Sequence, residues 1–290
     1  MSEKRPKVSV VTRTYNQEKF IAQAIESVLM QQVDFDYEFV IGEDCSSDAT
    51  REVVLRYQKK YPEIIRPFLP EHNVGRHKNF GTILEMTRGH YTALLDGDDY
   101  WVDPHKLQRQ VEYLDSHPEC SLCFHNAILV YESETKNHLF NTEQLQPILT
   151  LEDLLHRNFI PSCSPVFRTK VYGILPQWFY SIPVCDWPLF ILCAQKGSLK
   201  YFEEPMGVYR IHHGGIWAQS YEEVSTGRIQ QRQADIEVYK IFSKHLGSAY
   251  EKLIKKEIKG RVLQKHKEQI KHMLASAFPT VYRAYRRMRH

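Results

Sequence analysis

Apolar residues in the first 130 positions occur either as short continuous runs or at helical spacing. Runs such as residues 8–12 and 91–95 are typical of buried strands, whereas Ile21, Ile25 and Val28 recur on one face of a helix. Strands that alternate with helices of about 10–15 residues indicate βαβ units, a parallel sheet and right-handed crossovers. The pattern therefore predicts the α/β fold class.

The same pattern gives bounds for each element. We expect strands at residues 8–12, 37–41, 64–68, 91–95 and 121–130. We expect helices at residues 18–30, 77–86 and 106–115, and one from a cap at Ser47 or Asp48 to about residue 61. Ligands bind at the carboxyl ends of strands in such sheets, so the polar clusters that follow the strands are candidate site residues. These clusters lie at residues 13–16, 43–48 and 96–99.

The cluster Asp96-Gly97-Asp98-Asp99 directly follows an apolar run. Three carboxylates at the end of a buried strand repel one another and lose hydration, so they need a cation or a row of donors among them. Carboxylate oxygens are the ligands that Mg²⁺ or Mn²⁺ prefers, and such a metal usually bridges a protein carboxylate to substrate phosphates. The alternative is an Asp-Gly turn that caps a helix beginning near Pro104. At this point both interpretations stay open.

Length and composition restrict the class of protein. A chain of 290 residues forms one large domain or a domain with an appendage, and 42% hydrophobic and 25% charged residues are ordinary for a soluble globular protein. The polar start of the chain does not resemble a signal peptide, and no apolar run approaches the ~20 residues that cross a bilayer. The six cysteines are scattered, and we expect Cys120 and Cys123 to be buried reduced thiols. These features predict a cytoplasmic protein.

Two common nucleotide-binding motifs are missing from the sequence. No Gly-x-Gly-x-x-Gly follows the first strand and no Walker-type lysine loop occurs, which excludes the usual Rossmann mode for NAD and the P-loop mode for ATP. A diphosphate held without a glycine cradle needs its charge neutralised in another way. A metal on Asp98 and a cation such as Arg76 would do so.

Four motifs recur together, in order and at matching spacing. They are residues 8–16, residues 43–50, residues 73–76 with Asn79, and residues 95–99, which contain an Asp-x-Asp motif. Together they resemble the family 2 glycosyltransferases over roughly residues 6–215. The resemblance implies the GT-A fold, with a Rossmann-like, mostly parallel sheet flanked by helices. It further implies an inverting, metal-dependent transferase that moves a sugar from a nucleotide-diphosphate donor, with UDP or dTDP expected.

The resemblance assigns roles to individual residues on the donor side. Glu43, where aspartate is usual, would hold the nucleotide base. Arg13 and Tyr15 would also contact the base, although Arg13 replaces the usual proline or threonine. Asp96 would face the ribose and Asp98 would bind Mn²⁺ or Mg²⁺.

Two residues of the second half complete the expected site. Asp186 precedes an apolar helix at residues 189–194, so from the sequence alone it reads as a helix N-cap. The resemblance instead implies that Asp186 is the base that takes the proton of the acceptor hydroxyl. It also implies that His212 approaches the phosphates or the metal; a solvent-exposed loop histidine is the alternative.

Charge is concentrated at the carboxyl-terminal end. Residues 251–290 hold twelve Lys or Arg and three Asp or Glu, and Ile254, Ile258, Ile270 and Leu274 recur there at helical spacing. A basic amphipathic segment of this kind is consistent with docking on an anionic bilayer, here the inner face of the cell membrane. The alternative is a helical appendage with a solvated basic face. No nucleic-acid motif accompanies the charge, so we expect no nucleic-acid partner.

These expectations define two domains and two functions. Residues 1–218 would form the catalytic domain, with a nucleotide-sugar half at about 6–120 and an acceptor half at about 121–218. Residues 219–290 would form a C-terminal basic helical appendage. The family implies a glycan or lipid-linked acceptor and a role in cell-surface polysaccharide biosynthesis. The alternative function is a non-catalytic sugar-nucleotide or glycan-binding module, which would have no need of a base at Asp186.

Overall fold

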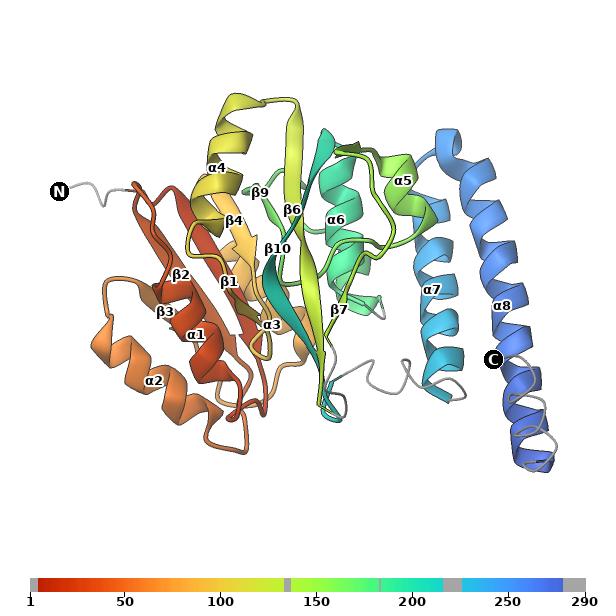
Figure 1. Ribbon diagram of the computed structural model, residues 1–290, viewed down its shortest axis with the longest axis horizontal. Coiled ribbons are helices and arrows are strands. Elements are labelled where there is room, and N and C mark those ends of the chain that lie inside the picture. Colours follow the sequence, from red (N-terminus) through yellow and green to blue (C-terminus); the bar gives the residue numbers. More distant parts are fainter. Residues whose placement is uncertain (1–4, 133–136, 183, 216–225, 279–290) are drawn as a thin grey trace. The chain divides into compact units, whose positions relative to one another are not determined.

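The computed structural model describes residues 5–132, 137–182, 184–215 and 226–278. The chain divides into two compact units (Figure 1). The first contains residues 1–181 and 185–210, and the second contains residues 182–184 and 211–290. The expected boundary at residue 218 falls among residues that lie outside the description, and the proposed domain division stays a prediction.

One sheet organises the first unit. Its strands follow the order β3-β2-β1-β4-β9-β6-β10-β5, with β7 paired to β6 and β8 paired to β10. The strand bounds are β1 (Val8–Thr14), β2 (Tyr37–Glu43), β3 (Ile65–Phe68), β4 (Tyr91–Leu94), β5 (Tyr100–Trp101), β6 (Cys120–Tyr131), β7 (His138–Leu139), β8 (Ile148–Leu149), β9 (Val166–Arg168) and β10 (Ser198–Ile211).

Four neighbouring strands of this sheet are parallel. Strand β1 pairs with β2 from Val8 opposite Tyr37, and with β4 from Val8 opposite Tyr91; β2 pairs with β3 in the same sense. The carboxyl ends of β1, β2 and β4 therefore meet at one edge of the sheet. The polar clusters that follow these strands gather at that edge, as the sequence predicts.

The fifth expected strand departs from the parallel pattern. Strand β6 runs beside β9, not beside β4, and β9 is antiparallel to both. A three-residue strand such as β9 carries too little apolar periodicity to be found in a sequence. The sheet is thus mixed, and its parallel half carries the predicted site residues.

Helices cover both faces of the sheet. Their bounds in the first unit are α1 (Ile21–Leu29), α2 (Thr50–Lys60), α3 (Arg76–Glu85), α4 (Lys106–Ser116), α5 (Leu151–His156) and α6 (Asp186–Ala194), with a 3₁₀ turn η1 (Gln177–Ser181). Residues of α1, α2 and α4 pack with Val8 and Val10 of β1 in one hydrophobic cluster. Val11 points to the other face, where it lies with Phe80 of α3. Side chains that alternate along β1 thus pack against helices on both faces of the sheet.

The described residues of the second unit form the helices α7 (Thr226–His245) and α8 (Glu251–Ala277), joined through a short turn, η3 (Ser248–Tyr250). Ile254 of α8 is fully buried, and Arg261 of α8 lies over the ring of Tyr239 of α7, 5.7 Å from its centroid. The expected helical appendage is confirmed. Its last expected part, residues 279–290, lies outside the described residues. No helix in the described part of the chain is both long and apolar enough to cross a bilayer.

Candidate active site

A tight turn presents the acidic cluster at the end of β4. The amide of Asp99 donates to the carbonyl of Asp96 at 3.1 Å, and the amide of Gly97 donates to the carbonyl of Arg13 at 3.1 Å. A Cβ atom at Gly97 would lie 2.5 Å from the Gln17 side chain and 2.8 Å from Cβ of Thr14. Only glycine therefore lets the acidic turn approach the end of β1 this closely.

Asp99 is the buried member of the cluster. Its side chain is 2% exposed and accepts a hydrogen bond of 2.9 Å from the amide of Arg210. Burial, together with the charges of Asp98 and Asp96, raises the pKa of Asp99 well above its ordinary value. Asp99 thus fastens the turn to β10 instead of facing a ligand, which agrees with a supporting role.

Arg210 holds the same turn from the other side. Its guanidinium donates to the carbonyl oxygen of Asp98 and to Gln23, and it lies 4.4 Å from the centroid of the Tyr100 ring. These contacts join β10, α1 and the acidic turn. Arg210 is not among the site residues predicted from the sequence, because its partners lie far away in the sequence. Its only signal was a cation at the end of an apolar strand.

The carboxylate chemistry of this turn fits a divalent cation. Asp98 is half-buried, and it lies between Asp96 and Asp99 in a single turn of hard oxygen donors. Within the described residues, no group of three or more His, Cys, Asp or Glu side chains is arranged as a metal site. Mg²⁺ is usually bound through one or two carboxylates and substrate phosphates, so the donor set at Asp98 suits a metal that arrives with its ligand.

Arg13 and Asp96, both expected on the donor side, form an ion pair. The Nε and Nη2 atoms of Arg13 donate to the two oxygens of Asp96 at 2.6 and 3.1 Å. The guanidinium also lies over the ring of Phe80, 4.9 Å from its centroid. Because the pair is bidentate, it fixes the direction of the Asp96 carboxylate.

We expect Arg13→Met to lower the free energy of unfolding by about 1–3 kcal/mol, because Asp96 would keep a partly buried charge without its donor. Chemical denaturation of both proteins measures this. Arg109→Met is the matched control: Arg109 pairs with Asp103 at 3.1 Å but is more exposed, so its loss should cost about 1 kcal/mol or less. Equal losses in the two variants would mean that the Arg13–Asp96 pair contributes no more than a surface ion pair.

Asp186 lies beside Arg13 and Asp96 in the first unit. It is the first residue of α6, and with Arg13, Asp96, Phe80 and Ser162 it lines a cavity of about 10 Å³. Burial raises the pKa of Asp186 above its ordinary value, although the positive charge of Arg13 acts in the opposite direction. The fold thus brings together three predicted residues from β1, the turn after β4 and the start of α6.

The structure does not support the N-cap reading of Asp186. The N-cap position of α6 is Cys185, and its side chain makes no capping hydrogen bond. Asp186 lies one position later, in the first turn, where a carboxylate interacts favourably with the helix dipole. Hydrogen bonds from the backbone amides of Asp186 and Trp187 also favour its ionised form and so lower its pKa.

Glu43 is fully buried at the end of β2. Its carboxylate forms an ion pair with Arg51 and accepts a hydrogen bond of 2.7 Å from the amide of Ser46. The neighbouring Asp44 accepts hydrogen bonds from the amides of Val74 and Gly75, at 2.8 and 3.0 Å. Glu43 thus organises its own loop, while Asp44, to which the sequence assigned no individual role, holds the loop before α3. The base contact expected of Glu43 stays a prediction.

The remaining predicted residues lie at or near the surface. Tyr15 is 48% exposed at the end of β1, and Arg76 is exposed at the start of α3. His212 belongs to the second unit, where its carbonyl accepts a hydrogen bond of 2.8 Å from the amide of Gly215. The roles expected of these three side chains toward a donor or a metal stay predictions.

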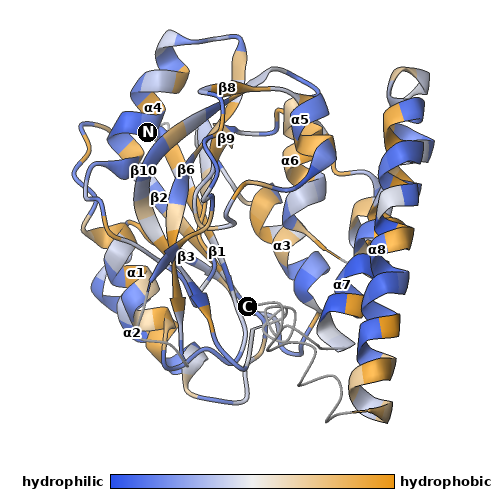
Figure 2. Ribbon diagram, turned by 45° about the vertical axis from the view of Figure 1, so that its right-hand side comes forward, coloured by the Kyte–Doolittle hydropathy of each residue, from blue (hydrophilic) through white to orange (hydrophobic). Residues whose placement is uncertain are grey.

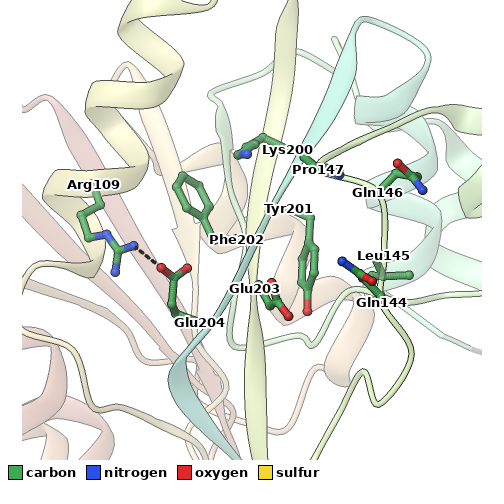
Figure 3. A pocket seen from close by; sticks show the side chains of 10 residues that line it. All are labelled: Arg109, Gln144, Leu145, Gln146, Pro147, Lys200, Tyr201, Phe202, Glu203 and Glu204. Atoms are coloured by element: carbon green, nitrogen blue, oxygen red, sulfur yellow. Dashed lines mark ion pairs between the residues drawn. The ribbon is translucent and has the colours of Figure 1, made fainter.

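A separate hollow of about 490 Å³ lies over the first half of β10 (Figure 3). Its cations are already engaged: Arg109 pairs with Glu204 at 3.4 Å, and Lys200 lies 5.4 Å from the centroid of the Phe202 ring. None of the predicted site residues lines it. Arg210, which contacts the acidic turn, lies toward the opposite end of the same strand. We therefore place the candidate site at the acidic turn.

Comparison with known proteins identifies the family of the chain. A model of the family described as glycosyl transferase family 2 matches residues 9–173. An uncharacterized protein of Mycobacterium tuberculosis is 39% identical over 217 residues, which cover 74% of this chain but 62% of that relative. This chain thus spans less than two thirds of that relative's length. TuaG of Bacillus subtilis, provisionally named a teichuronic acid biosynthesis glycosyltransferase, is 33% identical over 77% of this chain and 86% of its own.

Two kinds of solved structure share the fold. TarS of S. aureus (residues 1–349, in complex with UDP-GlcNAc) matches with a TM-score of 0.64 and 21% identity, covering 88% of this chain and 72% of that one. The mannosyltransferase PcManGT of Pyrobaculum calidifontis, in complex with GDP-Man and Mn²⁺, matches with a TM-score of 0.63 and 14% identity, covering 99% and 80%. These likenesses confirm the predicted α/β fold of the GT-A type.

Proposed function

The chain belongs to glycosyl transferase family 2, and we propose that it is an inverting, metal-dependent glycosyltransferase. In this proposal it moves a sugar from a nucleotide-diphosphate donor to a hydroxyl of a glycan or lipid-linked acceptor. The observation that carries the proposal is the meeting of Asp96 and Asp186 at one cavity, beside the acidic turn that holds Asp98. A module that only binds a sugar nucleotide would need the acids of the turn, Asp96 and Asp98, but it would not need Asp186.

The donor would lie along the carboxyl ends of the parallel strands. Tyr15, Glu43 and Arg76 are the proposed contacts to its base and phosphates, and Asp96, directed by Arg13, the contact to its ribose. UDP or dTDP remains the proposed nucleotide. TarS with UDP-GlcNAc supports a uridine nucleotide, whereas PcManGT with GDP-Man shows that this fold also accepts guanine.

Asp98 would hold Mn²⁺ or Mg²⁺. The Mn²⁺ in the complex of PcManGT supports this assignment. When bound, the ion would supply positive charge that stabilises the departing nucleoside diphosphate. Arg210 would keep the Asp98 turn in place through its hydrogen bond to the backbone. No second protonating carboxylate is then needed, unlike in a glycoside hydrolase.

Asp186 would act as the base. A carboxylate near the acceptor hydroxyl accepts its proton as the new C1–O bond forms on the face opposite the leaving group. Burial raises the pKa of Asp186, which makes its carboxylate a stronger proton acceptor than an exposed aspartate. Arg13, which lowers that pKa, would keep Asp186 ionised at neutral pH.

The cellular setting is part of the same proposal. The name of TuaG supports a role in the synthesis of a cell-surface polysaccharide. We place the protein in the cytoplasm, on the inner face of the cell membrane, where nucleotide sugars and lipid-linked acceptors meet.

Release of free nucleotide tests the proposal. The protein is incubated with Mn²⁺ and a panel of UDP-, dTDP- and GDP-sugars, with and without a glycan acceptor, and free nucleotide is assayed. We expect one donor class to be consumed and excess chelator to stop the reaction. Tight binding of a sugar nucleotide without any nucleotide release would instead identify a binding module.

The pH dependence of turnover gives a further prediction. Asp186 accepts a proton only as the carboxylate, so activity is present above its pKa and is lost as the pH falls through it. Because that pKa is raised, the acid limb of the kcat profile should lie above the ordinary aspartate value of about 3.9. Arg13→Met removes a charge that lowers this pKa, and it should move the limb to still higher pH. A limb that stays in place in this variant would argue against Asp186 as the titrating group.

A further inference from the structure

Helix α8 carries apolar side chains on two opposite faces. Ile254 is fully buried, and on the same face Lys265 reaches Gln233 of α7 at 2.7 Å. At 100° per residue, Leu263, Ile270 and Leu274 lie within about 40° of one another on the opposite side. The apolar positions that the sequence predicted as a single stripe therefore form two stripes. One packs on α7 and the other does not.

The second stripe is exposed. It contains five large apolar side chains that are each between 44% and 60% accessible: Leu263, Ile270, Met273, Leu274 and Phe278. Figure 2 shows hydrophobic positions interleaved with hydrophilic ones along this helix. Removing such a stripe from contact with water would be favourable, so it has the character of a contact surface.

The same side of α8 is basic. Lys252, Lys256, Lys259 and Lys267 are exposed, and helical geometry places them within about 60° of the stripe. The acids of the helix lie elsewhere or are paired: Glu251 with Lys255, Glu257 with Arg261, and Glu268 with Lys271. The exposed side of α8 therefore combines an apolar carboxyl-terminal half with a positive amino-terminal half.

We infer that this side of α8 docks on an anionic lipid bilayer. The stripe would lie at the boundary of headgroups and acyl chains, the lysines of the amino-terminal half would meet lipid phosphates, and Lys267 would reach the headgroups along its apolar stem. The inference extends the proposed function, because it would bring the site to a lipid-linked acceptor, but the contact itself requires no catalysis.

Charge argues against a second copy of this chain as the occupant. In a parallel pairing the lysines of the two helices would face each other, and in an antiparallel pairing they would lie against the apolar stripe. Either arrangement leaves positive charges near one another or poorly hydrated. Nucleic acid would satisfy the lysines but offers no apolar surface for the stripe. An anionic bilayer satisfies both halves.

Flotation of the full chain with vesicles tests the inference. Vesicles of phosphatidylcholine with phosphatidylglycerol, and of phosphatidylcholine alone, are mixed with the protein at low salt. We expect binding to the anionic vesicles that weakens as the salt concentration rises. The triple variant Leu263→Gln, Ile270→Gln, Leu274→Gln should lose at least about tenfold in partition coefficient. Ile174→Gln is the matched control, because Ile174 is 94% exposed in the first unit and should not matter.

The lysines are tested separately. The triple variant Lys252→Gln, Lys256→Gln, Lys259→Gln should lose about a hundredfold in partition coefficient at low salt, and little at high salt. The exposed Lys59 of α2 provides the control Lys59→Gln, which should partition like the wild type. The altered side chains are exposed, so circular dichroism and melting curves should remain those of the wild type.

Three results would overturn the inference. The first is absence of vesicle binding by the wild-type protein, and the second is equal partition of the stripe variant and the wild type. The third is a dimer in sedimentation that the stripe variant abolishes, with no lipid binding, which would make a second copy the occupant. Nucleotide release without an acceptor should be the same in all α8 variants. Failure of the proposed function would thus appear in that assay and not in flotation.

Discussion

Replacing Asp186 with asparagine is expected to lower turnover at least about a hundredfold, while thermal stability and donor binding stay at wild-type values. Asparagine keeps the size of the side chain at the first position of α6 but cannot accept a proton. Loss of a negative charge from the first turn costs the helix less than about 1 kcal/mol. Turnover, melting temperature and calorimetric binding of the donor measure the three quantities.

Glu52→Gln is a matched control for the Asp186 variant. Glu52 is also an acid in the first turn of a helix, α2, but it lines none of the cavities at the acidic turn. Its replacement should leave turnover unchanged. If Asp186→Asn lost stability and activity together, Asp186 would be structural and the base would be another residue.

Asp98→Asn is expected to weaken Mn²⁺ or Mg²⁺ binding and to reduce turnover nearly to the background rate. An amide oxygen is a weaker ligand for a hard cation than a carboxylate. The fold should be kept, because the turn is held by the backbone carbonyl of Asp98, which accepts from Arg210, and by the side chain of Asp99. Titration of activity with Mn²⁺ in the wild type and the variant measures the change.

Asp103→Asn serves as the control for Asp98, because Asp103 lies close in sequence but pairs with Arg109. It should retain the wild-type response to Mn²⁺. Full activity of Asp98→Asn would contradict the metal assignment. Undiminished activity of the wild type in excess chelator would contradict metal dependence altogether.

The strands that carry the site could be predicted because each has its signal within one short run of residues. The runs that become β1, β2 and β4 are mostly apolar and contain no glycine or proline, and the structure places their ends within three residues of expectation. β5 and β9, of two and three residues, could not be predicted. Such strands exist because a long neighbour offers hydrogen bonds, and this tertiary effect leaves no periodic signal.

The candidate site shows the same division. The acids at residues 96–99 could be found because they are contiguous and follow a buried strand. The ion pair of Arg13 with Asp96 joins positions 83 residues apart, and no spacing rule reports it. The contact of Arg210 with Asp99, across 111 residues, was missed for the same reason. Glu43 was assigned by resemblance, whereas its pairing with Arg51 became visible only in the fold.

The exposed stripe of α8 in the second unit could not be predicted from the sequence either. Helical spacing detected apolar residues throughout the helix but could not say which of them packs against α7. Ile254 and Leu274 belong to the same sequence pattern, yet one is fully buried and the other is 44% exposed. The position of the partner helix decides between them.

The anomeric configuration of the released or transferred sugar tests the central claim most directly. The wild-type protein is mixed with Mn²⁺ and the donor that the nucleotide-release assay identifies, and the first product is followed by proton NMR before mutarotation. A single displacement at C1, with Asp186 as the base, predicts a product whose anomeric configuration is opposite to that of the donor, and predicts no such product from Asp186→Asn. A product that keeps the donor's configuration, or a bound donor that is never consumed, would contradict the account.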